Sequence, residues 1–138
     1  MMTDRKRILQ IEDNPRDWRL ASDWLPDVDI IVAVTFSEGV QKYRDGGRFD
    51  LVLLDLDLPD TDSPWDTIER AELVFRGGPN VVALTVHRLN SSMIPLADVV
   101  HKKSPEELPV AVAGAMLTCE KNKLFPALLE ALDVGVFP

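Results

Sequence analysis

The stretch that decides the fold is residues 51–59, with the sequence LVLLDLDLP. Four consecutive apolar residues, Leu51 to Leu54, predict a strand that is buried on both faces, because a half-exposed strand would alternate apolar and polar side chains. Two carboxylates, Asp55 and Asp57, follow directly. The stretch therefore predicts a central strand of a parallel sheet with acidic side chains at its carboxyl end.

Four more apolar runs of this kind occur along the chain, and each is short enough to be a strand. They lie at Ile8 to Ile11, Ile30 to Val34, Val81 to Leu84 and, more weakly, Val99 to Val100. Segments with helical spacing separate them, so strand and helix alternate five times. This alternation predicts an α/β fold, an open parallel sheet with helices on both faces.

The predicted helices begin at residues that commonly start helices. The start signals are Asn14-Pro15, Ser37, Ser63-Pro64 and the capping box Ser104-Pro105-Glu106-Glu107. Each is followed by apolar side chains that should face the sheet, namely Trp18, Ala21 and Leu25; Val40 and Tyr43; Trp65, Ile68, Ala71 and Phe75; and Leu108, Val112, Ala115 and Cys119. Residues 88–96 show little periodicity, so we expect a short or poorly formed helix there.

Composition narrows the class of protein. The chain has 138 residues, 46% of them apolar, which suits one domain with one core. The net charge of −8 disfavours direct binding to nucleic acid and to anionic membranes. No apolar run approaches the roughly 20 residues of a membrane span, the start does not resemble a signal peptide, and the single cysteine has no disulfide partner. We therefore expect a cytoplasmic protein without membrane insertion.

Polar side chains gather at the predicted carboxyl ends of the strands, where ligands of open parallel sheets bind. Converging carboxylates repel one another unless a hard cation neutralises them, and Mg²⁺ prefers oxygen ligands. A carboxylate can also attack phosphorus and form an aspartyl-phosphate. The residues in question are Glu12, Asp13, Asp55, Asp57, Thr85 and Lys103.

In this order and spacing, these residues resemble the receiver domain of response regulators. The resemblance rests on Glu12-Asp13-Asn14, residues 53–59, Thr85 and Lys103, and it covers roughly residues 6–120. It implies a flavodoxin-like three-layer sandwich with a five-stranded parallel sheet in the order 2-1-3-4-5. It also implies a phosphorylation-dependent signalling switch that catalyses only its own phosphorylation and dephosphorylation.

The resemblance assigns a magnesium site. Glu12, usually through water, and Asp13 would bind Mg²⁺ after the first strand. Asp55 would supply a carboxylate oxygen, and Asp57 its backbone carbonyl. The expected cofactor is therefore Mg²⁺, with all protein ligands from two strand ends.

The resemblance also assigns the residues that handle the phosphoryl group. Asp55 would be the phosphoacceptor, Thr85 would sense the phosphoryl group, and Lys103 would pair with it. Lys102 directly precedes Lys103, so an alignment shifted by one residue is an alternative. His87, two residues after Thr85, is either a residue that modulates hydrolysis of the acyl phosphate or an exposed loop histidine.

Four positions depart from the usual receiver pattern. Ser63 replaces a loop glycine, Val86 replaces a small residue beside the path of the phosphodonor, Val100 replaces a switch aromatic, and Ser104 replaces a proline. Only 18 residues separate Thr85 from Lys103, which agrees with a stunted helix between them. Our hypothesis is that the signal leaves by a different surface, involving the additional C-terminal segment 121–138.

Two other functions compete with the switch. A pseudo-receiver would keep the fold as a docking module without being phosphorylated. A haloacid-dehalogenase-type phosphatase would use Asp55-Leu56-Asp57 as nucleophile and general acid, although that pair normally follows the first strand of its sheet and a later acidic pair is missing.

Partners follow from the resemblance as well. The donor would be a sensor histidine kinase or a histidine phosphotransfer protein, and the downstream target would be another protein, because we expect the chain to be a single domain (1–138) without an output domain. The apolar segment 121–138 would pack on its own domain, with homodimerisation or docking as the alternative.

Overall fold

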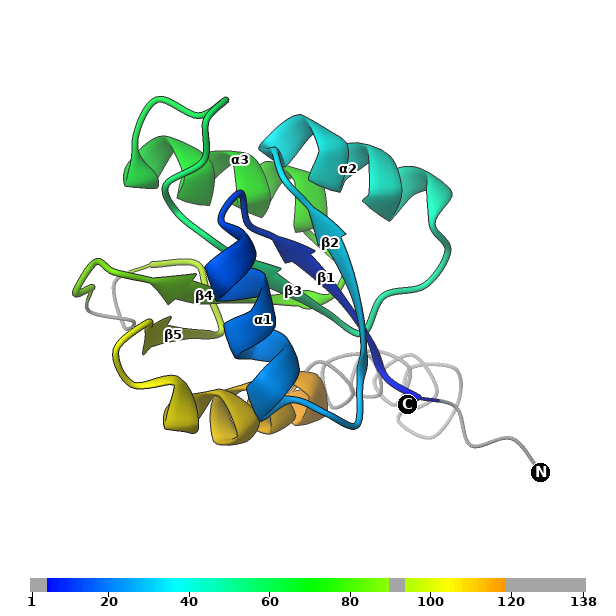
Figure 1. Ribbon diagram of the computed structural model, residues 1–138. Helices are drawn as coiled ribbons and strands as arrows, with labels where there is room; N and C mark the ends of the chain where they lie inside the picture. The colour runs from blue at the N-terminus through cyan, green and yellow to red at the C-terminus, as the bar shows by residue number, and fades with distance from the viewer. Residues whose placement is uncertain (1–4, 90–93, 119–138) are drawn as a thin grey trace, which may run out of the picture.

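The computed structural model describes residues 5–89 and 94–118. A five-stranded sheet runs through this part of the chain, with the order β2-β1-β3-β4-β5 and every neighbouring pair parallel. The strands are β1 (Arg7–Ile11), β2 (Asp29–Ala33), β3 (Leu51–Leu54), β4 (Asn80–Thr85) and β5 (Asp98–His101). The predicted fold class and strand order are confirmed (Figure 1).

Helices cover both faces of the sheet and complete three layers (Figure 1). α2 (Phe36–Asp45) and α3 (Pro64–Phe75) lie on one face. α1 (Pro15–Trp24) lies on the other, beside a helix over residues 108–118 that follows the short 3₁₀ helix η2 (Pro105–Glu107). Within residues 5–89 and 94–118, none of these helices has the length and apolarity of a membrane span.

The sheet buries a separate apolar core on each face. Successive side chains of a strand point to opposite faces, so β1 sends Leu9 and Ile11 toward α2 and α3, and Ile8 toward α1. All four residues of β3 are buried, which agrees with their continuous apolarity. Packing on both faces therefore fixes the end of β3, and with it the position of Asp55, the next residue.

The start signals of α1 and α3 are confirmed, and that of the last helix is not. The side chains of Asn14 and Ser63 each accept a hydrogen bond of 3.0 Å from a backbone N–H of the first turn. Ser104 makes no capping hydrogen bond, and a 3₁₀ turn comes first. Because Pro109 has no backbone N–H, a regular α-helical first turn cannot form there.

α2 is capped by Thr35, so the prediction of Ser37 as its cap is wrong. The Thr35 hydroxyl accepts a hydrogen bond from the backbone N–H of Glu38 (3.0 Å), and the Glu38 carboxylate accepts one from Val34 (3.2 Å). This pair resembles a capping box, although Glu38 accepts from Val34, one residue before the cap, and not from Thr35 itself. The pattern Thr-x-x-Glu was present in the sequence and outweighs an isolated serine.

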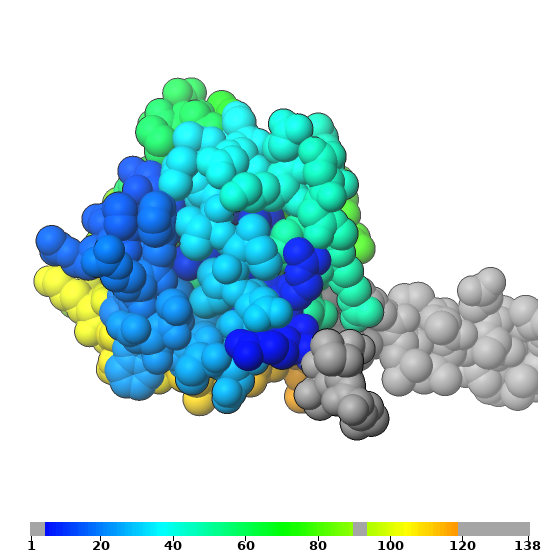
Figure 2. Space-filling view, turned by 45° about the vertical axis from the view of Figure 1, so that its right-hand side comes forward, coloured from blue at the N-terminus to red at the C-terminus, as the bar shows by residue number. Residues whose placement is uncertain are grey.

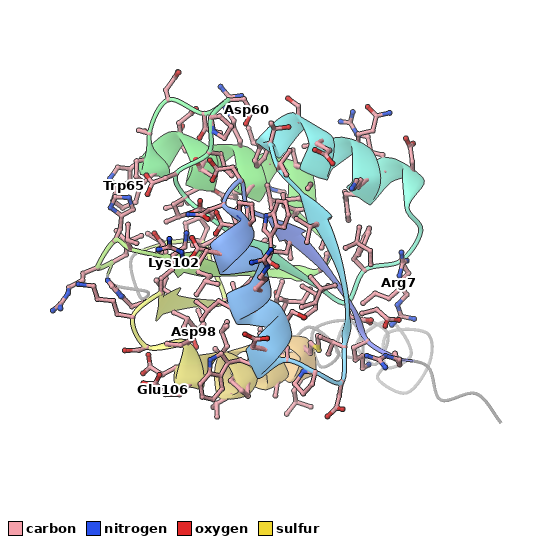
Figure 3. All side chains as sticks on the ribbon, in the orientation of Figure 1. Arg7, Asp60, Trp65, Asp98, Lys102 and Glu106 are labelled. Carbon is pink, nitrogen blue, oxygen red and sulfur yellow. The ribbon has the colours of Figure 1, made fainter. Side chains whose placement is uncertain are left out.

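Trp65 departs from the predicted apolar stripe of α3. Ile68, Ala71 and Phe75 are buried as expected, but Trp65 is 55% exposed. It belongs to the first turn of the helix, beyond the packed stripe, and lies at the edge of the molecule in Figure 3.

Some predictions concern residues that the structure does not describe. Residues 88–89 and 94–96 are not helical, in agreement with their weak periodicity. Residues 90–93, Cys119 and the C-terminal segment 121–138 lie outside the described ranges.

Candidate functional site

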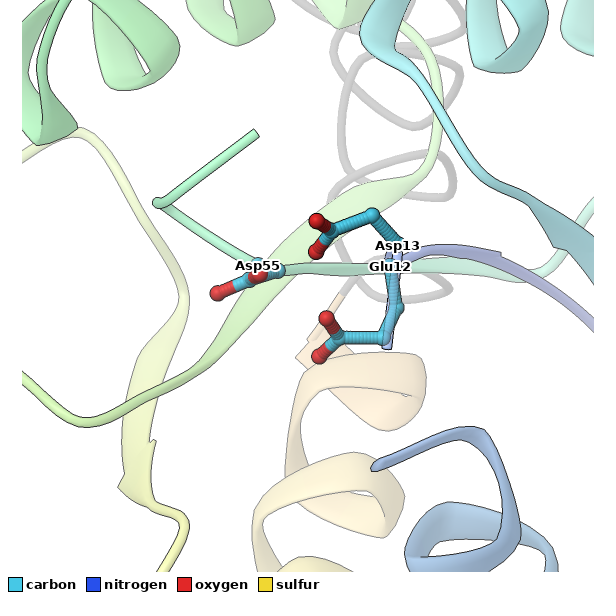
Figure 4. Close-up of side chains that lie close together, drawn as sticks. All are labelled: Glu12, Asp13 and Asp55. Atoms are coloured by element: carbon cyan, nitrogen blue, oxygen red, sulfur yellow. The ribbon is translucent and has the colours of Figure 1, made fainter. Parts of the chain in front are cut away.

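Two neighbouring strands bring three carboxylates to one edge of the sheet. Ile11 pairs with Leu54, so the residues that follow β1 and β3 lie side by side. The backbone N–H of Asp55 donates to the carbonyl of Ile11 (2.9 Å) and extends the pairing by one residue. Carboxylate oxygens of Glu12, Asp13 and Asp55 lie within 4.8 Å of one another. Figure 4 shows the three side chains close together.

Burial of this cluster is uneven and changes its protonation. Glu12 is 1% exposed and Asp55 4%, whereas Asp13 is exposed. Burial raises the pKa of Glu12 to about 8, and the neighbouring Asp55 adds to the effect. Burial also raises the pKa of Asp55, although the hydrogen bond from Glu12 and the charge of Lys102 oppose it. In the metal-free protein, Glu12 therefore holds a proton at neutral pH.

The ammonium group that faces this cluster belongs to Lys102. Its Nζ atom lies 2.7 Å from a carboxylate oxygen of Asp17, 2.9 Å from one of Glu12 and 3.4 Å from one of Asp55. The lysine in contact with Asp55 is thus one residue earlier than Lys103, which is exposed. This corrects the expected placement by one position.

Strand alternation explains why Lys102 reaches the cluster. Val100 is buried on the α1 side of the sheet, and Lys102 comes two residues later on the same side. The backbone N–H of Lys102 donates to the carbonyl of Thr85 (2.9 Å), which continues the pairing of β5 past its last residue. The residue three positions before the lysine becomes Val99, which is not aromatic either.

Asp17 is a part of this cluster that the sequence analysis did not single out. It lies in the first turn of α1, and its pair with Lys102 joins residues 85 positions apart. Burial alone would lower the pKa of Lys102, but the hydrogen bonds to Asp17 and Glu12 and the charge of Asp55 outweigh it and hold this pKa above its usual value. Lys102 therefore stays charged.

Thr85, His87 and Asp57 form a second group beside the carboxylates. Thr85 is fully buried, and its hydroxyl accepts a hydrogen bond from the backbone N–H of His87 (3.1 Å). The Nε2 atom of His87 lies 2.9 and 2.8 Å from the two carboxylate oxygens of Asp57. The backbone N–H of Asp57 donates to Asp55 (3.3 Å). His87 is therefore a loop residue whose ring contacts Asp57, and its role in hydrolysis of the acyl phosphate stays a prediction.

The loop between β3 and α3 is held in place by Asp60. Its carboxylate accepts hydrogen bonds from the backbone N–H groups of Phe36 (2.8 Å) and Ser37 (2.9 Å), at the start of α2. Figure 3 shows Asp60 between α2 and α3. Beside this loop, Asp13 and Asp57 line an open hollow of about 300 Å³. The hollow gives solvent and small molecules a route to the exposed side of the cluster.

The donor atoms of the site fit a hard divalent cation. Glu12, Asp13 and Asp55 offer only oxygen ligands. With Asp17, the site holds four carboxylates and one ammonium, that of Lys102, which contacts Glu12, Asp17 and Asp55. A proton on Glu12 therefore still leaves two excess negative charges. Apart from its ion pair with Lys102, the Oε1 atom of Glu12 has no hydrogen-bond partner among residues 5–89 and 94–118. The chemistry of these residues thus fits the expected magnesium site.

Solved structures with the same architecture identify the fold. The chain is similar to a CheY-like response regulator receiver domain protein from Methanospirillum hungatei JF-1, with 23% sequence identity and a TM-score of 0.71 over 86% of this chain and 99% of that one. The fold is that of a receiver domain. The signal receiver domain of a putative Luxo repressor protein from Vibrio parahaemolyticus matches with 23% identity and a TM-score of 0.71, over 88% of this chain and 98% of that one.

A third structure extends this likeness to lower sequence identity. The signal receiver domain of an HD domain-containing protein from Pseudomonas fluorescens Pf-5 has 16% identity and a TM-score of 0.71, over 86% of this chain and 99% of that one. No protein-family model matches the sequence, and no curated protein matches it. The resemblance to receiver domains is therefore confirmed for the fold, while the roles of individual residues stay predictions.

Proposed function

We propose that this chain is a phosphorylation-dependent switch of two-component signalling, in which Asp55 accepts a phosphoryl group with the help of Mg²⁺. The position of Asp55 carries the proposal. Its carboxylate stands at the end of a central strand, beside Glu12 and Asp13 and 3.4 Å from the ammonium of Lys102. The receiver fold supports the same function.

The chemistry begins with the carboxylate of Asp55. One of its oxygens attacks phosphorus and forms an O–P bond, while the bond between phosphorus and the donor breaks and the leaving group keeps the electron pair. Attack of water on phosphorus later restores the carboxylate and releases inorganic phosphate. The switch thus catalyses its own modification and its own reversal.

Lys102 and Thr85 would stabilise the transferring group. Charge develops on the equatorial oxygens of phosphorus, and a fixed ammonium can neutralise part of it. The Thr85 hydroxyl accepts its hydrogen bond from His87, so its own proton is available for a phosphoryl oxygen. Both groups stand at strand ends, where the packed sheet fixes them.

Glu12, Asp13 and Asp55 would hold Mg²⁺, together with the backbone carbonyl of Asp57. When bound, the ion neutralises negative charge on the carboxylates and on the phosphoryl oxygens. Glu12 would give up its proton as the cation binds, because a charged carboxylate is the better ligand.

The implied donor is a sensor histidine kinase or a histidine phosphotransfer protein. A phosphohistidine supplies a P–N bond that the Asp55 carboxylate can displace. The signal would pass onward through contact with another protein in the cytoplasm, because the net charge of −8 disfavours direct contact with nucleic acid.

Intact mass spectrometry tests the proposal. The protein is incubated with Mg²⁺ and acetyl phosphate, and we expect the mass to rise by one phosphoryl group. The matched control is Asp55→Asn, which keeps the shape of the side chain but removes the nucleophile, and it should gain nothing. An equal gain in Asp55→Asn would refute the role of Asp55.

A pseudo-receiver is the second candidate, and the low exposure of Asp55 favours it. At 4% exposure, the acceptor is hard for a donor to reach, and the exposed Val86 stands where a small residue is usual. A wild-type protein that gains no phosphoryl group from acetyl phosphate, or from a histidine kinase, would support this docking function.

The phosphatase alternative makes a different prediction. It requires steady turnover of a generic phosphate ester that is lost in Asp57→Asn. The Asp57 carboxylate is paired with His87 at 2.8 Å, which gives little support to Asp57 as a general acid. A single, non-catalytic phosphorylation event would exclude it.

A further inference from the structure

Asp17 makes the shortest contact with the lysine of the site, although nothing in the proposed chemistry uses it. The Lys102 ammonium lies 2.7 Å from Asp17 but 3.4 Å from Asp55. In a shared ion-pair network, the closest carboxylate has the strongest hold on the ammonium. The resting position of Lys102 is therefore biased toward α1 and away from the phosphoacceptor.

The pair is well placed for this effect because it is largely shielded from solvent. The side chain of Lys102 is 12% exposed and that of Asp17 is 16% exposed, so water and salt screen their attraction only in part. Asp17 sits in the first turn of α1, which Asn14 caps. Because the first turn of α1 is capped, the backbone of Asp17 is held in place, and this limits where its carboxylate can move.

The pair also joins two elements that are distant in sequence. Lys102 follows β5 directly, and α1 packs beside the segment after β5, as the adjoining blue and yellow surfaces in Figure 2 show. Figure 3 shows Lys102 close to the first turn of α1. Breaking the ion pair between Asp17 and Lys102 would therefore remove a contact between α1 and the end of the sheet.

We propose that Asp17 is a positioning residue that holds the Lys102 ammonium on the α1 side of the site until a phosphoryl group on Asp55 competes for it. This inference rests on the proposed function. Phosphorylation adds negative oxygens at Asp55, Lys102 exchanges Asp17 for one of them, and no covalent bond changes in that exchange. The ion pair that joins α1 to the end of β5 is then broken, so the contacts of α1 depend on whether Asp55 is phosphorylated.

Binding of fluoroberyllate, a phosphoryl mimic, tests the competition. Isothermal titration in the presence of Mg²⁺ compares wild type with Asp17→Asn, which removes the charge but keeps the shape. We expect roughly two- to fivefold tighter binding in Asp17→Asn, the range that a partly exposed ion pair is worth. Equal or weaker binding would overturn the proposal.

Asp23→Asn is the matched control. Asp23 is an exposed aspartate of the same helix near its other end, so this variant removes the same charge without touching Lys102. Its affinity should equal that of wild type. A gain in affinity equal to that of Asp17→Asn would mean that the loss of any negative charge on α1 strengthens binding. It would overturn the specific role of Asp17. Asp17→Ser provides a second neutral side chain if Asp17→Asn does not fold.

A crystal structure of the variant without Mg²⁺ or fluoroberyllate separates this inference from the proposed function. In Asp17→Asn, the Lys102 Nζ should move closer to Asp55 than 3.4 Å. An unchanged distance overturns the positioning role. If wild type binds no fluoroberyllate and accepts no phosphoryl group, the proposed function fails, and this distance still decides whether Asp17 holds Lys102.

Discussion

At the scale of single residues, Lys102 controls the charge of the site. It faces three carboxylates and is only 12% exposed, so its loss leaves buried negative charge without a partner. We predict that Lys102→Met lowers the free energy of unfolding by about 3 kcal/mol. It should also slow phosphorylation by acetyl phosphate by about 10²-fold, because one fixed charge is missing in the transition state.

Lys103→Met is the control for this prediction. Lys103 is the adjacent, exposed lysine, so its replacement should change stability by less than about 0.5 kcal/mol. Urea unfolding and phosphorylation kinetics of both variants give the comparison. A larger effect at Lys103 than at Lys102 would show that the lysine has been assigned to the wrong position.

Glu12 should make stability depend on pH. Burial raises its pKa from 4.5 to about 8, so the folded protein binds this proton more tightly than the unfolded chain does. The resulting stability is fully present below pH 4.5 and is lost as the pH rises through about 8. Between pH 5 and pH 8, we expect the metal-free protein to lose on the order of a few kcal/mol.

Urea unfolding of the metal-free protein across this pH range measures the effect, with Glu12→Gln as the control. Glutamine cannot titrate, so the variant should lose much less stability over the same range. Parallel pH profiles of wild type and Glu12→Gln would contradict the raised pKa.

The residues of the site differ in how far the sequence could predict them. Glu12, Asp13 and Asp55 directly follow apolar strands, and the structure brings their carboxylates together. Strand alternation could have identified Lys102, because it continues the buried side of Val100. The contact of Asp17 could not be predicted, since a pairing across 85 residues depends on how α1 packs beside the end of β5.

At the scale of helices and strands, capping gives a direct prediction. The Ser63 hydroxyl accepts a hydrogen bond from the backbone N–H of Asp66, whereas Ser104 makes no capping hydrogen bond. Ser63→Ala should therefore cost about 1 kcal/mol of unfolding free energy, and Ser63→Gly only a few tenths. Ser104→Ala should stay within about 0.5 kcal/mol of wild type.

Chemical unfolding of the three variants at one pH gives the values. A cost at Ser104 that equals the cost at Ser63 would contradict the observed caps.

The cap at Ser63 also explains one departure from the receiver pattern. Serine in place of glycine at position 63 has extended backbone angles and supplies the cap of α3, so glycine is not required there.

Elements were predicted well where one signal dominates and poorly where two compete. The run Leu51 to Leu54 has the same bounds as β3. A strand buried on both faces is apolar at every position, so the first polar residue marks its end. Ser37 was predicted as the cap of α2, but Thr35 caps this helix, and Glu38 adds a hydrogen bond from the backbone N–H of Val34. Trp65 fits the helical spacing, but spacing alone cannot tell where the neighbouring layer ends.

At the scale of the whole molecule, binding of Mg²⁺ should stabilise the fold. A ligand that binds only the folded state adds about 2.7 kcal/mol at a hundred times its Kd. We therefore expect Mg²⁺ to raise Tm by several degrees, and more at pH 8 than at pH 6, because Glu12 must lose its proton. Differential scanning calorimetry with and without Mg²⁺ measures the shift.

Asp13→Asn should weaken this stabilisation, because it removes the exposed carboxylate of the cluster. Asp23→Asn removes the same charge at a distance and should leave the shift unchanged. A shift of the same size in all three proteins would mean that Mg²⁺ acts on the general surface charge and not at this site.

The topology of the whole molecule could be predicted only in part from periodicity. Alternating strands and helices predict a parallel sheet, but the order β2-β1-β3-β4-β5 came from the resemblance to receiver domains and is confirmed by the structure. Apolar runs report burial and contain no information on which strand lies beside which. The six polar residues at predicted strand ends, through their resemblance to receiver domains, supplied that information.

The central claim is that Asp55 itself carries the phosphoryl group. Sodium borohydride reduces an aspartyl-phosphate to homoserine, so peptide mapping after reduction locates the modified residue. After incubation with Mg²⁺ and acetyl phosphate, we expect homoserine at position 55 in wild type and none without Mg²⁺. Homoserine at Asp13 or Asp57, or none at any position under conditions that phosphorylate a known receiver domain, would contradict the account.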